Sequence, residues 1–208
     1  MGSDDVWFIT KDRLKEVGER WVQENKTLGT YNTLFGEVEM PWVKGLKYRL
    51  NLGLNYRASK VGDFTGKGIN TADAGNPSGA SIQHSENLNW AVENVLSYDR
   101  TFADKHQVNA VAMYSAEQTT YTQAHMSGKD IPAEYFQYYN IGQAVQGTTV
   151  NPAYQNYWQA GLVSYMGRVM YSYDDKYMAS VAVRSDASSR LAKGHQWHTY
   201  PAISLGWN

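Results

Sequence analysis

Residues 46–57 alternate between apolar and polar side chains without a break, and this alternation limits the folds open to the chain. The apolar set is Leu46, Tyr48, Leu50, Leu52, Leu54 and Tyr56. A period of two is typical of a β-strand, because successive side chains of a strand point to opposite faces. A tilted strand of about 9 to 11 residues crosses a hydrocarbon core, whereas strands of soluble domains usually have about 5 or 6 residues. The stretch therefore predicts a membrane-spanning strand.

Weaker alternation recurs along the chain and predicts about seven strands, the last of them cut by the chain end. The further segments are residues 33–40, 88–98, 106–116, 163–173, 177–186 and 203–207. The expected connections 41–45, 99–105 and 174–176 are short, while 58–86, 117–161 and 187–199 are long. Short turns that alternate with long loops are typical of an antiparallel outer-membrane β-barrel. Residues 1–30 do not fit, and Leu14, Val17 and Trp21 after Thr10 predict a loop region with a short helix.

Composition agrees with this interpretation and excludes several classes. The 16 tyrosines, 7 tryptophans and 18 glycines favour strands, aromatic girdles and turns. A net charge of −1, from 19 basic and 20 acidic residues without a basic stripe, argues against nucleic-acid binding. Cysteine is absent, which excludes a disulfide scaffold and a thiolate zinc site. The sequence has neither an apolar run long enough for a transmembrane helix nor the pattern of a signal peptide.

Several ordered motifs resemble one family of membrane proteins. They are ENVLSYDRTF at 93–102, YMGRVMYSYDDKY at 165–177, RSDASSR at 184–190 and YPAISLGW at 200–207, with NTLFG at 32–36 and Gly45-Leu46 before them. At these spacings they resemble the SusC/RagA family of TonB-dependent outer-membrane transporters, within it the SusC-like glycan receptors of Bacteroidetes. The likeness covers about residues 30–208. Ala187 departs from the family, which usually has glycine there, so we expect a different turn at that point.

The resemblance implies a barrel of about 22 strands around an N-terminal plug, in the outer membrane of a Gram-negative, Bacteroidetes-like cell. It implies import of oligosaccharides such as starch-type glycans, a SusD-like surface lipoprotein and the TonB complex as partners, and contact with outer-membrane lipid. No plug, TonB box or closing C-terminal strands are recognisable. Residues 31–208 are therefore expected to form a partial barrel, with no catalytic residue, metal or cofactor.

Aromatic residues fall into two expected groups. In the predicted loop 133–158, the rings of Tyr135, Tyr138, Tyr139, Tyr157 and Trp158 can stack on sugar rings, so we predict oligosaccharide contact there. The alternative is packing of the loop itself or docking against a lid protein. The second group, near strand ends, suits interfacial girdles and comprises Trp42, Tyr56, Trp90, Tyr98, Phe102 and Trp207. Polar residues expected to face the lumen or plug are Arg49, Asn51, Glu93, Asn94, Arg168 and Arg184.

Residues that suggest chemistry have simpler interpretations. His195 and His198 stand three apart without a carboxylate at a metal-binding spacing, in a segment typical of a loop. Asp174 and Asp175 fit a turn. Residues 62–68 lack the spacing of a phosphate-binding loop and are expected to be flexible. Two other functions stay open: a soluble all-β carbohydrate-binding module, and a glycoside hydrolase.

Overall fold

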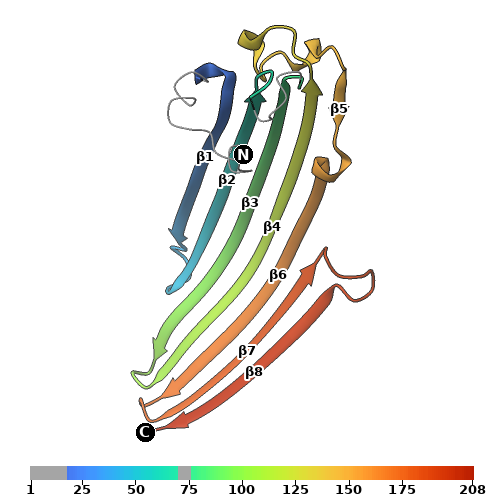
Figure 1. The fold of residues 1–208 in the computed structure, drawn as a ribbon. Helices are drawn as coiled ribbons and strands as arrows, with labels where there is room; N and C mark the ends of the chain where they lie inside the picture. Colours follow the sequence, from blue (N-terminus) through green and yellow to red (C-terminus); the bar gives the residue numbers. More distant parts are fainter. Residues whose placement is uncertain (1–17, 70–75) are drawn as a thin grey trace, which may run out of the picture. The chain divides into compact units, whose positions relative to one another are not determined.

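The computed structural model describes residues 18–69 and 76–208 and is an all-β, antiparallel fold (Figure 1). Its strands are β1 (Trp21–Glu39), β2 (Leu46–Thr65), β3 (Gly79–Phe102), β4 (His106–Lys129), β5 (Thr148–Val150), β6 (Asn156–Tyr173), β7 (Tyr177–Ser188) and β8 (Trp197–Trp207). Short 3-10 helices occur at η2 (Gly18–Arg20), η3 (Glu134–Phe136), η4 (Ile141–Gln143) and η5 (Pro152–Tyr154). No helix in the described residues is long and apolar enough to cross a membrane.

The strands form one 8-stranded sheet in the order β1-β2-β3-β4-β6-β7-β8, with β5 paired to β4 beside this path. Each strand predicted from alternation lies largely within an observed strand, so the predicted fold class is confirmed. The observed strands are longer than predicted, with 24 residues in both β3 and β4. The short strand β5 was not predicted.

Two segments differ from their predicted conformation. The predicted loop region 1–30 is strand from Trp21 onward, because β1 begins there; residues 1–17, with the expected helix, lie outside the described residues. Residues 62–65 belong to β2 and are not a flexible loop. In both cases the backbone pairs with a neighbouring strand although the side chains show no clear alternation.

The alternation of short and long connections is confirmed. Residues 40–45, 103–105 and 174–176 link strands closely, whereas 66–78, 130–155 and 189–196 make the longer links, one of which contains β5 and three 3-10 helices. The long links are shorter than predicted because the strands on either side extend into them. Ala187 lies in β7, paired with Val163 and Trp197, so the different turn expected there does not occur.

Two of the short links, of three residues each, contain a tight turn with positive φ at both of its central residues. Ala103 and Asp104 have φ of 48° and 58°, and Asp174 and Asp175 both have φ of 52°. The amide of Lys105 donates to the carbonyl of Phe102 at 3.2 Å, and that of Lys176 to Tyr173 at 3.0 Å. Aspartate tolerates this conformation, whereas alanine is strained in it.

We therefore expect Ala103→Asn to stabilise the β3–β4 hairpin by about 0.5–1 kcal/mol, because asparagine adopts positive φ more readily than alanine. Urea titration of the refolded intact protein in detergent micelles measures this gain. Asp174→Asn, at the equivalent position of the β6–β7 hairpin, is the matched control and should change the free energy of unfolding little. A loss of stability in Ala103→Asn would contradict the assignment of strain to Ala103.

The chain divides into two compact units, each made of parts of several strands. Unit 1 contains residues 1–29, 57–87 and 121–158, and unit 2 contains residues 30–56, 88–120 and 159–208. In unit 1, the connection after β4 covers the strands and forms a small core of Phe64, Ala80, Ile131, Tyr138, Ile141 and Ala144. In unit 2, most large apolar side chains on the strands are exposed.

Candidate functional site

One face of unit 2 is apolar over the paired strands β6, β7 and β8. Residues directly opposite each other in an antiparallel pair share a face. Val181 lies opposite Val169 on β6 and Ile203 on β8, at the centre of this face. The same face carries Val163, Tyr165, Gly167, Tyr171 and Tyr173 of β6, Tyr177, Ala179 and Val183 of β7, and Trp197, Pro201, Leu205 and Trp207 of β8. Ile203 and Leu205 are 74% and 82% exposed, so the face needs an apolar environment outside the described residues.

Aromatic side chains stand at both ends of this apolar face. Tyr173, Tyr177 and Trp207 lie at the end with the short hairpin, where Tyr177 pairs with the other two. At the far end Trp197 stacks on Tyr165 with ring centroids 5.9 Å apart. Trp197 and Trp207 are separated by about 33 Å along the strand, or roughly 25 Å across a membrane at a strand tilt of about 40°. That is the height of the apolar band of an outer-membrane barrel.

Of the predicted girdle residues, Trp207 lies on the apolar face of β6, β7 and β8. The others lie in β2 and β3, including Tyr98 and Phe102 near the short-link end of β3, or in the β1–β2 link. Trp207 lies at the end of the apolar face, and Trp42, 80% exposed, lies in the short β1–β2 link. Tyr56 and Trp90 lie within β2 and β3, ten residues from Leu46 and twelve from Phe102, a separation along the strand similar to that between Trp197 and Trp207. The sequence did not predict that Tyr165 and Trp197 lie together at the far end of the apolar face. Their contact depends on how β6, β7 and β8 pair, which the sequence pattern does not give.

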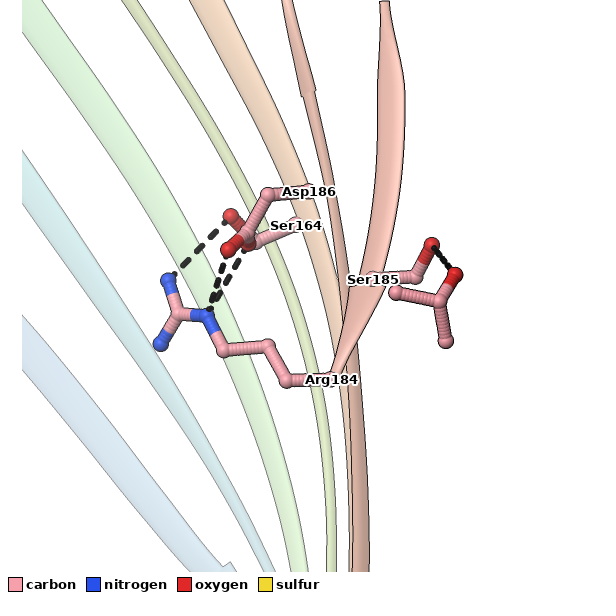
Figure 2. Close-up of polar contacts among 5 residues, drawn as sticks. Ser164, Arg184, Ser185 and Asp186 are labelled. Carbon is pink, nitrogen blue, oxygen red and sulfur yellow. Dashed lines mark hydrogen bonds and ion pairs between the residues drawn. The ribbon is translucent and has the colours of Figure 1, made fainter. Parts of the chain in front are cut away.

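The opposite face of the same strands is polar. Figure 2 shows Arg184 and Asp186 on one side of β7 and Ser185 on the other. Arg184 Nε donates to Asp186 Oδ1 at 2.9 Å, and its Nη2 donates to Ser164 Oγ at 3.4 Å. Ser164 is 1% exposed beneath these groups. Arg168 shares this face, since it lies opposite Ala182; the predicted grouping of Arg168 with Arg184 is therefore confirmed.

Hydrogen bonds across β2 and β3 extend the polar face but correct one prediction. Asn51 Nδ2 donates to Glu93 Oε1 at 2.7 Å, and Arg49 Nε donates to Asn51 Oδ1 at 2.9 Å. Asn94 follows Glu93 directly and so points to the opposite, apolar face. There the hydroxyl of Tyr48 donates to Asn94 Oδ1 at 2.6 Å, which offsets the cost of a polar group in apolar surroundings. Asn94 is therefore not one of the lumen-facing residues.

The predicted aromatic contact residues all lie in unit 1 but are not equivalent. Tyr138 is 1% exposed and belongs to the core, so its ring offers no open platform. Tyr135, Tyr139 and Tyr157 are 77%, 61% and 68% exposed, and Trp158 is 40% exposed. Trp158 stacks on Tyr121 of β4 with centroids 5.7 Å apart, and Tyr135 packs edge-on against Phe136. Among these residues Tyr138 and Tyr139 lie close together, with centroids 4.3 Å apart.

Tyr138 is fixed by contacts on β1 and β2. Its hydroxyl donates to Glu24 and lies 3.0 Å from the hydroxyl of Tyr139, and Lys60 Nζ lies 5.4 Å from each ring centroid. A side chain at Gly62 would collide with the Tyr138 ring, since a Cβ there would lie 2.4 Å from its Cε2. Desolvation raises the pKa of the Tyr139 hydroxyl above its usual range, and the charge of Glu24 adds to this. Tyr139 therefore stays a hydrogen-bond donor at neutral pH.

A second contact holds the start of the same connection. Arg20 Nε donates to Glu134 Oε2 at 2.7 Å, which raises the pKa of Arg20. The described residues contain no group of three or more histidine, cysteine, aspartate or glutamate residues that could hold a metal ion. His195 lies in the link before β8, and His198 lies in β8 opposite Asp186, not in a loop as predicted.

Long antiparallel strands with one apolar, aromatic-bounded face and one polar face define the wall of a membrane-spanning β-barrel. Comparison with solved structures agrees. The chain is similar to the RagAB peptide transporter, with a TM-score of 0.77 and 13% sequence identity over 97% of this chain and 22% of that chain. The closed-closed state of the RagAB peptide importer gives a TM-score of 0.79 over 96% of this chain and 22% of that chain, also at 13% identity.

Sequence comparison confirms the resemblance to SusC-like TonB-dependent receptors. A TonB-dependent receptor of Formosa agariphila is 28% identical over 193 residues, which is 91% of this chain and 18% of that protein. The TonB-dependent receptor SusC of Bacteroides thetaiotaomicron is 46% identical over 46 residues, or 22% of this chain and 5% of that protein. No family model matches. The chain thus resembles SusC-like TonB-dependent receptors over most of its length, and it spans less than a fifth of the length of the curated relatives it matches.

Proposed function

We propose that this chain forms part of the wall of a TonB-dependent outer-membrane transporter that imports oligosaccharides. The observation that carries the proposal is the amphipathic sheet of unit 2, whose apolar face is bounded by aromatics about 25 Å apart across the membrane. The named relatives are receptors and transporters, which supports a transport function without catalysis. A SusD-like surface lipoprotein and the TonB complex are the proposed partners, and the outer membrane is the proposed location.

A soluble carbohydrate-binding module is disfavoured by the strands themselves. Such a module buries one face of each sheet against a second sheet and uses short strands. Here β1 to β4 each have about 20 residues or more, and the apolar face of β8 is exposed.

The nature of the cargo has one competing interpretation, because the RagAB structures are described as a peptide transporter and importer. A peptide cargo is therefore the second candidate.

The exposed aromatics of unit 1 favour the oligosaccharide, since their rings offer flat apolar surfaces to sugars. We expect the double variant Tyr139→Ala and Tyr157→Ala of the intact receptor to bind maltoheptaose about three- to tenfold more weakly, measured by isothermal titration calorimetry. Tyr138 is excluded from this test because its removal disturbs the core. The control is Trp42→Ala, an exposed aromatic in a short link.

Either of two results would count against this assignment. Unchanged affinity in the double variant removes these rings from sugar binding and leaves packing or docking of the loop as their role. An intact receptor that imports peptides and no oligosaccharide would replace the proposed cargo with the second candidate.

A further inference from the structure

A polar hollow of about 460 Å³ lies in unit 1 over β2, β3, β4 and β5. This volume is within the range of small-molecule sites, about 300–1,000 Å³. Its polar side chains come from several strands and from the link before β5: Asp63, Thr65, Ser81, Ser127, Lys129, Gln146 and Thr149. The other lining residues are Gly79, Ala80, Gly128 and Gly147.

Apart from Ala80, which belongs to both, the side chains of β2 and β3 that line the hollow lie on the opposite face from the aromatic core of unit 1. Phe64 and Ala80 are buried under the connection that carries Tyr138. Their chain neighbours Asp63 and Ser81 therefore point away from that core, because successive side chains of a strand alternate. The hollow is consequently a separate surface from the aromatic residues to which the sequence assigned sugar contact.

The functional groups of the hollow match a ligand rich in hydroxyl groups. The hydroxyls of Thr65, Ser81, Ser127 and Thr149 both donate and accept, as does the amide of Gln146, while Asp63 accepts and Lys129 donates. Ser81 Oγ donates to Asp63 Oδ2 at 3.4 Å. In the described part of the chain, Lys129 has no ion-pair partner.

We propose that this hollow is an oligosaccharide subsite, which binds a sugar unit through hydrogen bonds to these side chains. The inference rests on the proposed transport function. It adds a second place for sugar binding, where polar contacts hold the sugar instead of aromatic stacking. A sugar ring presents hydroxyls in several directions and can pair with a mixed set of donors and acceptors. A peptide with large apolar side chains fits less well, because Ala80 alone, among the described residues that line the hollow, has an apolar side chain.

Two glycines keep the hollow open and supply the test. A Cβ at Gly79 or at Gly147 would meet no atom within 4 Å. Gly147 has a φ of +79°, so a side chain there would strain the backbone, whereas Gly79 is not in the positive-φ region. Leucine at position 79 can therefore project into the hollow without disturbing the strand.

The experiment compares Gly79→Leu with Gly142→Leu in the intact receptor. Gly142 also has open space around its Cβ but lies outside the hollow, in η4. Calorimetry measures binding of maltoheptaose, cellohexaose, xylohexaose and a mixed hexapeptide. We expect Gly79→Leu to weaken binding of the preferred oligosaccharide by about tenfold or more, Ser81→Ala and Thr149→Ala by about threefold each, and Gly142→Leu to leave it unchanged. Circular dichroism checks that each variant is folded.

The outcomes separate this inference from the proposed function. If the wild-type receptor binds an oligosaccharide and Gly79→Leu binds it equally well, the subsite is wrong and the proposed cargo stands. If the wild-type receptor binds the hexapeptide and none of the three oligosaccharides, both the subsite and the proposed cargo are wrong. If Gly142→Leu weakens binding as much as Gly79→Leu does, the hollow is not the cause of the loss and the subsite is rejected.

Discussion

Val181→Lys is expected to destabilise the intact receptor in a lipid bilayer by about 2–4 kcal/mol, the cost of placing a lysine on the lipid face near the membrane midplane. Val181 is 54% exposed and lies between Val169 and Ile203 at the centre of the apolar face. The aromatic residues at both ends of that face place it within the hydrocarbon layer. Urea titration of the protein refolded into lipid vesicles measures the free energy of unfolding.

The matched control is Ser180→Lys, one residue earlier on the same strand. Ser180 lies opposite Met170 and Ser204 on the polar face, so a lysine there does not contact lipid. We expect this variant to change the free energy of unfolding by less than about 1 kcal/mol. Equal losses for the two variants would show that the apolar face does not contact the hydrocarbon layer. A larger loss for Ser180→Lys would assign the two faces the other way round.

The sequence predicts a strand well where the strand's two faces meet different surroundings. In residues 46–57 apolar and polar side chains separate completely, and β2 was predicted correctly there. Residues 117–129 are polar at nearly every position and show no period of two. The sequence therefore predicts a loop there, whereas β4 continues to Lys129. Backbone hydrogen bonds hold a strand whether or not its faces differ, but only a difference between the faces leaves a periodic signal.

The candidate sites were harder to predict, for reasons that differ between residues. The position of Asn94 could have been predicted from the sequence. Successive side chains of a strand point to opposite faces, so Asn94 and its direct neighbour Glu93 cannot occupy the same face. The burial of Tyr138 could not be predicted in this way. It depends on contacts with Glu24 and Gly62, which are remote in sequence and adjacent only after the connection folds back on β1 and β2. The polar hollow likewise exists only because β5 pairs with β4.

Tyr138→Ala is expected to lower the free energy of local unfolding of residues 130–147 by about 3–5 kcal/mol, the usual cost of removing a large buried aromatic side chain. Tyr138 is 1% exposed and is the largest side chain in the core of unit 1. Its loss removes both the packing against Gly62 and the hydrogen bond to Glu24. Hydrogen exchange of the backbone amides in residues 130–147 of the intact receptor measures this change.

A double-mutant cycle with Gly62→Ala tests whether the contact itself is responsible. In the wild-type protein the new Cβ would lie 2.4 Å from the Tyr138 ring, and we expect overpacking to cost about 1–3 kcal/mol. After Tyr138→Ala the same Cβ enters the space that the ring has left, so Gly62→Ala should then cost almost nothing. Simple addition of the two losses would mean that the ring does not pack on Gly62 and that another contact anchors the connection to β2.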